Sequence, residues 1–171
     1  MFKVPKTQLH HLFLIFVCLV NIAGCSTPEI IPEPMQFPVR LVITPAADIN
    51  PDYQNRPSPM VIRIYQLSQL DNFNNNDFYA LYEQDRSLLS NQLLHSEEIE
   101  LIPGQNQFKI LQVHRNANFI AVLAAYRDLD HAQWKTYIPV KPDQETIALG
   151  LSIEKSEVKI NKLLFSIEKN K

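Results

Sequence analysis

The sequence is poor in glycine and in cysteine. Only three glycines occur in 171 residues, so the chain cannot build a glycine-rich loop of the kind that binds phosphate. The two cysteines, Cys18 and Cys25, both lie near the N-terminus. No disulfide framework can therefore hold the rest of the chain, and its stability must come from a packed core. Hydrophobic residues make up 46% of the sequence, which is enough for a core of normal size.

Motifs for nucleic-acid binding, metal binding and hydrolysis are also missing from the sequence. No run of Lys or Arg forms a basic patch, so nucleic acid is not an expected partner. The histidines after residue 25 are isolated, with no HxH or HExxH spacing, so no zinc site is expected; they are His95, His114 and His131. The GxSxG motif of serine hydrolases does not occur. We therefore expect no catalysis, no cofactor and no small-molecule substrate.

The N-terminus resembles a bacterial lipoprotein signal peptide. Lys3 and Lys6 give it a basic start, and an apolar run extends from Leu12 to Val20. Small residues then precede a cysteine in the stretch Ile22–Cys25. The two alternatives are a transmembrane anchor and an ordinary secretory signal. The apolar stretch is only about a dozen residues long, whereas a membrane span needs roughly 20. The Ala-Gly-Cys ending favours lipidation, so we predict a signal peptide over residues 1–24 and a covalent lipid on Cys25.

A proline-rich segment follows the cysteine. Prolines at positions 28, 32, 34 and 38 fix φ and lack an N–H donor, so residues 25–38 are predicted to form an extended tether. Ser26 stands where an Asp commonly signals retention at the inner membrane of bacteria. We therefore expect the lipid in the outer membrane and the domain in the periplasm. Loss of the signal peptide would remove two lysines and leave 14 basic against 18 acidic side chains.

Residues 39–171 are predicted to form one mainly β domain. Val39–Thr44 is short and rich in β-branched residues, and Met60–Leu67 is nearly continuously apolar, as in a strand covered on both faces. Later strand-like segments recur at regular spacing, which is typical of a two-sheet sandwich; they are 99–101, 108–113, 118–126, 134–140, 146–153 and 158–167. Between them, residues 68–94 change to a helical period. We expect a small helical insertion that covers one end of the β core, with Asn76 capping the helix that starts at Asp77.

The segment Pro45–Pro59 is the best candidate for a binding element. It joins the first two predicted strands and is longer than most loops of a compact domain, and such loops are commonly functional or disordered. Its prolines lower the entropy cost of holding one shape, so we predict an ordered, protruding loop. Aromatic and Arg side chains are enriched at interface hot spots, which favours Tyr53 and Arg56 as contact residues over a merely solvated loop. The candidate binding residues are Asp48, Asn50, Pro51, Asp52, Tyr53, Gln54, Asn55 and Arg56.

Other charged and aromatic residues have structural interpretations that outweigh functional ones. The charges of the helical insertion could form an acid/base cluster, but a solvated helix face is the simpler reading; they are Asp77, Glu83, Asp85 and Arg86. Trp134 is expected to pack on the sheet rather than to bind a ligand. Arg127 and Asp128 are expected to end a strand with a local ion pair, which contributes little where it is exposed.

The ordered set of motifs resembles one family, the outer-membrane lipoprotein of the type VI secretion system (TssJ, also called SciN or VasD). The lipoprotein signal comes first, followed by Asn50-Pro51-Asp52 and by Arg56-Pro57-Ser58-Pro59 ahead of the second strand. Leu101-Ile102-Pro103-Gly104 and Ala124-Ala125-Tyr126-Arg127-Asp128 follow, and Trp134 closes the set. The resemblance covers most of residues 39–140.

The resemblance implies a transthyretin-like β-sandwich that carries no catalytic activity. Members of this family bind the periplasmic C-terminal part of the large inner-membrane component, TssM, through the loop between the first two strands, which here is residues 46–58. The alternative is a lipid-anchored sandwich that binds a small ligand or glycan. That alternative predicts His, Arg or exposed aromatic side chains converging on one cleft, and the sequence offers no such cluster.

Overall fold

The computed structural model describes residues 35–141 and 147–163, which fold into two four-stranded sheets with short helices. The predicted signal peptide, Cys25 and residues 25–34 of the predicted tether lie outside the described residues, as does the predicted continuation of the last strand to residue 167. The described elements are β1 (Gln36–Pro45), β2 (Met60–Leu67), α2 (Asp71–Asn75), α3 (Phe78–Leu89), η2 (Ser90–Gln92), β3 (Leu93–Leu101), β4 (Gln107–His114), β5 (Phe119–Ala124), β6 (Lys135–Pro139), β7 (Ile147–Ile153) and β8 (Val158–Lys162).

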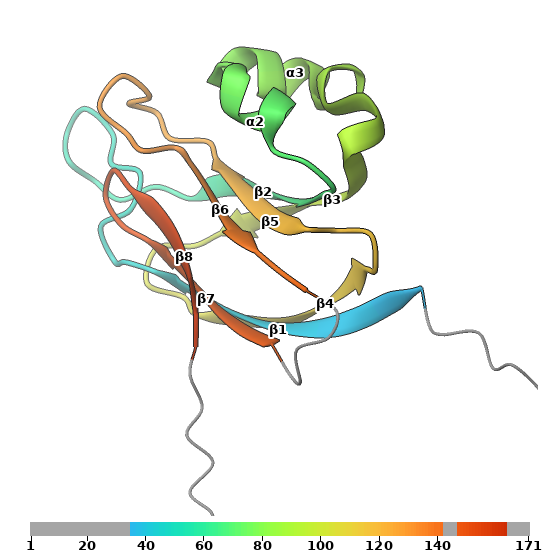
Figure 1. Cartoon of the computed structure of the whole chain (residues 1–171). Helices are drawn as coiled ribbons and strands as arrows, with labels where there is room; N and C mark the ends of the chain where they lie inside the picture. Colours follow the sequence, from blue (N-terminus) through green and yellow to red (C-terminus); the bar gives the residue numbers. More distant parts are fainter. Residues whose placement is uncertain (1–34, 142–146, 164–171) are drawn as a thin grey trace, which may run out of the picture. The chain divides into compact units, whose positions relative to one another are not determined.

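The first sheet has the strand order β4-β1-β7-β8 (Figure 1). Strand β1 is central: it pairs antiparallel with β4 and parallel with β7. It begins three residues before the predicted start at Val39, because residues 36–38 pair with β4. Pro38 fits there because β7 pairs with β1 only from Val39 onward, so the missing N–H of Pro38 is not needed on the β7 side.

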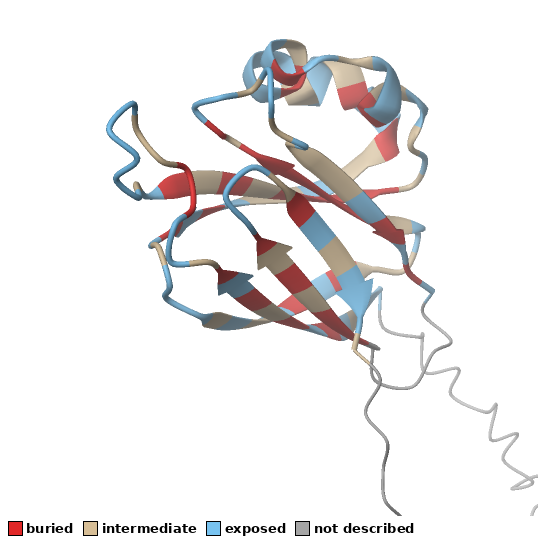
Figure 2. Cartoon of the chain, turned by 90° about the vertical axis from the view of Figure 1, so that its left-hand side faces the viewer, coloured by how far each residue is buried: buried red, intermediate tan, exposed pale blue. Residues whose placement is uncertain are grey.

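The second sheet has the strand order β3-β2-β5-β6, and both of its faces are covered. Side chains alternate along β2: Ile62 and Ile64 point into the sandwich, whereas Tyr65 and Leu67 belong to a second apolar cluster beneath the helices. This double coverage explains the nearly continuous apolar run of β2 and confirms its predicted bounds. Figure 2 shows the resulting burial along the strands.

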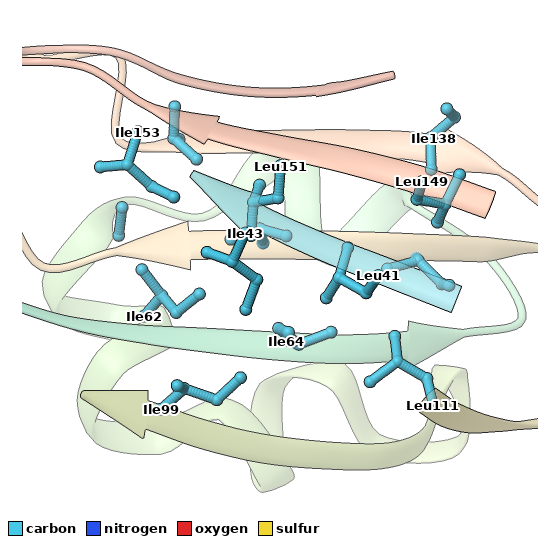
Figure 3. Packing of buried hydrophobic residues seen from close by; sticks show 14 of the residues in the cluster. Leu41, Ile43, Ile62, Ile64, Ile99, Leu111, Ile138, Leu149, Leu151 and Ile153 are labelled. Carbon is cyan, nitrogen blue, oxygen red and sulfur yellow. The ribbon is translucent and has the colours of Figure 1, made fainter. Parts of the chain in front are cut away.

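The sandwich core lies between the two sheets. Leu41 and Ile43 of β1 face Ile62 and Ile64 of β2 across the layer, and all four side chains are buried (Figure 3). Leu149, Leu151 and Ile153 of β7 extend the same cluster. The prediction of a mainly β, two-sheet sandwich is confirmed, and the odd-numbered positions of β1 and β7 supply one wall of its core.

The helices cover the outer face of the second sheet rather than one end of the core. Leu81 of α3 and Phe73 of α2 are buried against Tyr65 of β2, and Trp134 meets Phe78 edge-on with ring centroids 5.5 Å apart. The expected packing role of Trp134 is therefore confirmed. The Lys135 ammonium of β6 donates to three carbonyls at the end of α2, those of residues 73, 74 and 76, at 2.9–3.1 Å.

Two predictions about the helical insertion are wrong in detail. Asp77, not Asn76, caps α3: its Oδ1 accepts from the Ala80 N–H at 2.9 Å, because the helix starts at residue 78. Asp85 does not belong to a solvated face, since it pairs with Arg63 of β2 at 3.0 Å with both side chains largely buried. Arg63 also binds Glu98 of β3 at 2.9 Å, so these charges join α3 to the sheet.

Candidate protein-binding loop

Residues 46–59 form the loop between β1 and β2, at the end of the sandwich where the β5–β6 connection and the β7–β8 turn also lie (Figure 1). The base of the loop is fixed by its backbone. The Ala46 N–H donates to the Ile153 carbonyl at 2.8 Å, and the Gly104 N–H donates to the Ala46 carbonyl at 3.1 Å. Ile49 is fully buried in the sandwich core. The loop is therefore ordered, as predicted, and its base is part of the domain.

Asn50 joins the loop to the β5–β6 connection. Its side chain is buried, its Nδ2 donates to the Pro59 carbonyl at 3.0 Å, and its Oδ1 accepts from the Arg127 N–H at 2.8 Å. Its backbone lies in the left-handed region, with φ of +48°, which Asn tolerates better than most residues. The structure thus places this predicted contact residue inside the domain, where it holds both ends of the loop.

The tip of the loop is a compact turn built around Asp52. Its Oδ1 accepts from the backbone N–H of Gln54 and Arg56 at 2.8 and 3.0 Å, and its Oδ2 accepts from the Arg56 guanidinium at 2.8 Å. The hydrogen bonds from Arg56, backbone first, hold the pKa of Asp52 below its usual range. Asn55 supplies the left-handed position of the turn, with φ of +59°. The charge of Arg56 therefore sits in a defined place.

The tip presents an exposed aromatic side chain. Tyr53 is 89% exposed, and its hydroxyl has a single neighbouring polar group among the described residues, the Gln54 amide at 3.4 Å. Gln54, Asn55, Arg56 and Pro57 are also exposed. An exposed Tyr and an Arg on a fixed turn supply anchors for a protein interface at low entropy cost. Asp48 is exposed near the base, whereas Pro51 and Asp52 are half-buried.

A small cavity lies beside the loop. Its volume is about 220 Å³, and it is bordered by Asn50, Tyr126, Asp128, His131 and Lys155. The Asp128 carboxylate binds His131 Nδ1 at 2.8 Å, and this contact raises the pKa of His131 above its ordinary value. The Tyr126 hydroxyl donates to the Glu154 carbonyl at 3.1 Å, which ties the β5–β6 connection to the β7–β8 turn.

Sequence reasoning missed this group of residues. It treated His131 as isolated and paired Arg127 with Asp128, whereas Asp128 pairs with His131 and Arg127 uses its backbone N–H to bind Asn50. The spacing of Asp128 and His131, three residues apart, was the available signal. No local pattern could show that residues 50 and 127, which are 77 positions apart, are in contact.

The described residues show neither a metal centre nor a membrane span. No group of three or more His, Cys, Asp or Glu side chains among them is placed to hold a metal ion. Within residues 35–141 and 147–163, no helix has the length and apolar character that crossing a bilayer requires.

A family model matches residues 38–162, and it describes the type VI secretion lipoproteins (VasD, EvfM, TssJ). A search of curated proteins finds no match. Among solved structures, the lipoprotein TssJ1 of Pseudomonas aeruginosa is similar with a TM-score of 0.72 and 26% identity, over 77% of this chain and 99% of that one.

Two further solved structures share the fold. Serratia marcescens Lip, described as a membrane-bound component of the type VI secretion system, matches with a TM-score of 0.68 and 24% identity, over 76% of this chain and 99% of that one. A structure described as the TssM C-terminal domain from EAEC contains a chain that matches with a TM-score of 0.59 and 20% identity, over 75% of this chain and 98% of that one.

Proposed function

The chain belongs to the type VI secretion lipoprotein family, and from that premise we propose that it is a non-catalytic anchor of the envelope-spanning secretion complex. In this role the domain binds the periplasmic C-terminal domain of the large inner-membrane component, a TssM-like protein. Cys25 carries the covalent lipid, and the lipid holds the domain on the periplasmic side of the outer membrane.

The form of the loop between β1 and β2 is the observation that supports this proposal. Its base is fixed by Asn50 and by core packing of Ile49, while its tip exposes Tyr53 and Arg56. A fixed loop with exposed aromatic and Arg side chains binds a protein surface without a large ordering cost. A small-ligand site beside the loop receives less support, because the cavity there, at about 220 Å³, is smaller than the roughly 300–1,000 Å³ typical of ligand sites.

Exposed residues of the tip are the ones we propose as contacts. Tyr53 and Arg56 are the anchors, with Gln54 and Asn55 between them and Asp48 and Pro51 at the margin. Asp52 and Asn50 act indirectly, since their side chains hold the shape of the turn and of the loop base. Substitution of either one would therefore change binding through the position of Tyr53 and Arg56.

A titration with paired variants tests the contact role of Tyr53. Residues 26–171 are titrated against the periplasmic C-terminal domain of the TssM-like protein from the same organism. Tyr53→Ala is expected to weaken binding by about 30-fold, which corresponds to the roughly 2 kcal/mol of a hot-spot residue. Tyr79→Ala is the matched control, because Tyr79 is also exposed, at 65%, but lies on α3. Equal affinities of the two variants would remove Tyr53 from the interface.

The anchoring part of the proposal has its own test. Cys25→Ser in the full chain should leave the domain folded but release it from the outer membrane, with loss of secretion. Buried acyl chains contribute about 0.8 kcal/mol per CH₂, so two or more chains hold a protein on a membrane stably. A Cys25→Ser protein that stays in the outer-membrane fraction and supports secretion would contradict lipid anchoring.

A further inference from the structure

The two outer faces of the sandwich differ in what covers them. The helices cover the outer face of the second sheet, where Phe73 and Leu81 join the apolar cluster of Tyr65. No described helix or strand covers the outer face of the first sheet, on the side away from the helices (Figure 1). Two large apolar side chains of β4 on that face, Phe108 and Ile110, are 62% and 55% exposed. Adjacent exposed apolar side chains on a sheet face indicate an interaction surface.

The strand register arranges this outer face in rows, because residues directly opposite one another share a face. One row crosses all four strands and consists of Phe108, Val42, Gly150 and Asn161. The neighbouring row begins with Ile110, Arg40 and Ala148. The exposed apolar side chains therefore lie at the β4 end of both rows, and the other end is at β8.

The chain already lies on this face where it leaves β8. The Leu163 N–H donates to the Ala148 carbonyl at 2.8 Å, which extends the pairing of β8 with β7 by one residue. The Leu163 side chain lies over Gly150, since a Cβ on that glycine would come within 3.0 Å of Leu163 Cδ2. Leu163 is thereby half-buried on the outer face. Residues 164–171, which lie outside the described residues, continue from this point.

The sequence after β8 has the apolar pattern that this face requires. Residues 163–167 read Leu-Leu-Phe-Ser-Ile, so apolar side chains at positions 163, 165 and 167 recur at every second residue. In an extended segment such positions share one face, and Leu164 belongs to the opposite face. The residues that follow, Glu168–Lys171, are polar. An extended segment can therefore place Phe165 and Ile167 against the sheet and then pass into solvent.

The reach of this segment matches the width of the sheet. Three inter-strand spacings of about 4.8 Å separate β8 from β4, which gives about 14 Å. An extended chain advances about 3.3 Å per residue, so Phe165 comes about 7 Å and Ile167 about 13 Å from Leu163. Phe165 thus reaches the region between Gly150 and Val42, and Ile167 reaches the exposed side chains of β4.

We propose that residues 164–167 cross the outer face of the first sheet and cover Phe108 and Ile110 of β4. In this arrangement Phe165 packs over β7 and β1, and Ile167 packs against the two exposed side chains. A membrane surface or a second copy of the chain would also cover them, but no contact of the described domain positions either one. The segment is favoured because it is continuous with Leu163, which already lies on the face, and this link gives it a high effective concentration.

Thiol labelling tests the cover directly. Residues 26–171 contain no cysteine and keep both apolar clusters, which use no residue before Phe37. Arg40→Cys places a thiol at an exposed position of β1 beneath the proposed crossing, without removing an apolar contact. Thr44→Cys is the matched control, because it is exposed on the same face of the same strand but lies four residues, or about 13 Å, away.

Two variants of the segment separate a specific crossing from a general effect. Ile167→Ser removes an apolar side chain from the face that would meet the sheet, whereas Leu164→Ser removes one from the opposite face. Ile167→Ser should raise the labelling rate of the Arg40→Cys thiol about tenfold, since it removes most of the apolar burial at β4. Leu164→Ser should leave that rate nearly unchanged, and the Thr44→Cys thiol should keep its rate with both. A cooperative urea transition shows that each variant folds.

Labelling at several protein concentrations distinguishes the segment from the other covers. Protection of the Arg40→Cys thiol that Ile167→Ser removes and that dilution does not change would support the proposal. Equal rates with and without Ile167→Ser would overturn it. Protection that disappears on dilution would also overturn it and assign the face to a second copy. Protection that appears only with vesicles of phosphatidylethanolamine and phosphatidylglycerol would overturn it and assign the face to the membrane.

The outer face of the first sheet does not include the loop at residues 46–59, so the two surfaces can be tested separately. Ile167→Ser should leave the affinity for the TssM-like domain unchanged. Unaltered labelling rates together with intact loop-dependent binding would refute only this inference and leave the proposed function standing. A loss of that affinity with unaltered labelling rates would overturn the intramolecular cover and assign the segment to the partner.

Discussion

Asn50→Ala is predicted to destabilise the domain strongly, although Asn50 lies in a loop. The substitution removes two buried hydrogen bonds, to the Pro59 carbonyl at 3.0 Å and from the Arg127 N–H at 2.8 Å. Each contributes about 1 kcal/mol to the free energy of unfolding. Alanine in the left-handed region adds about 1 kcal/mol. The expected loss is therefore about 3 kcal/mol, or a fall in Tm of roughly 10 °C for a domain of this size.

Two companion variants separate these contributions. Asn55 also has a positive φ, of +59°, but its side chain is exposed and makes no hydrogen bond with any described residue. Asn55→Ala should therefore lower the free energy of unfolding only through backbone strain at the positive φ, by about 1 kcal/mol. Asn50→Gly should lower the free energy of unfolding by about 2 kcal/mol, because both hydrogen bonds are lost but glycine adopts the left-handed backbone conformation without strain.

Urea unfolding monitored by circular dichroism measures all three variants, with the slope of the transition checked for two-state behaviour. The reasoning is refuted if Asn50→Ala is no more destabilising than Asn55→Ala, because the two hydrogen bonds would then contribute nothing. It is also refuted if Asn50→Ala and Asn50→Gly have the same midpoint, since the strain of the left-handed position would then be absent.

Three further predictions concern the helices and the cavity. Lys135→Met should lower the free energy of unfolding by about 2 kcal/mol, because three carbonyls at the end of α2 lose a charged donor. The control, Lys159→Met at an exposed position of β8, should change the free energy of unfolding by less than about 0.5 kcal/mol. Urea midpoints compare the two variants. Asp77→Ala should cost about 1 kcal/mol through loss of the α3 cap, and Asp77→Asn should restore most of it. His131 should titrate above pH 6.5 by NMR because its hydrogen bond to Asp128 raises its pKa, and Asp128→Asn should lower that pKa. The ion pair stabilises the domain fully below pH 6.5, and this contribution is lost as the pH rises through the raised pKa of His131. An unshifted pKa of His131 would contradict the contact.

The loop and most of the strands were predictable from local sequence. Strand β3 is the exception, because it begins at Leu93, inside the predicted helical insertion (residues 68–94) and six residues before the predicted segment 99–101. Met60–Leu67 reads as a doubly covered strand because the sandwich core covers one face of β2 and the helices cover the other. The loop was predictable because its prolines and polar residues interrupt two clear strands. The helix cap was misplaced by one residue, since Asn76 and Asp77 are both good caps and local sequence does not decide between them.

Long-range polar contacts were not predictable. The contacts of Gln66 with β4, of Lys135 with α2 and of Asn50 with residue 127 each join positions far apart in the chain. A polar residue in a loop or strand has the same local signature whether it faces solvent or fixes a distant backbone group. Asn50 illustrates the consequence, because a residue selected as a surface contact is buried at the loop base.

The most direct test of the proposed function is a calorimetric titration with a shortened loop. The Asp52 N–H donates to the Arg56 carbonyl at 2.9 Å, so the ends of this turn are close, and two glycines can replace residues 52–56 while Asn50 keeps the loop base in place. The wild-type domain, residues 26–171, should bind the periplasmic C-terminal domain of the TssM-like protein, and the shortened domain should fold but not bind. Unchanged binding by the folded, shortened domain would contradict the assignment of the loop as the interface.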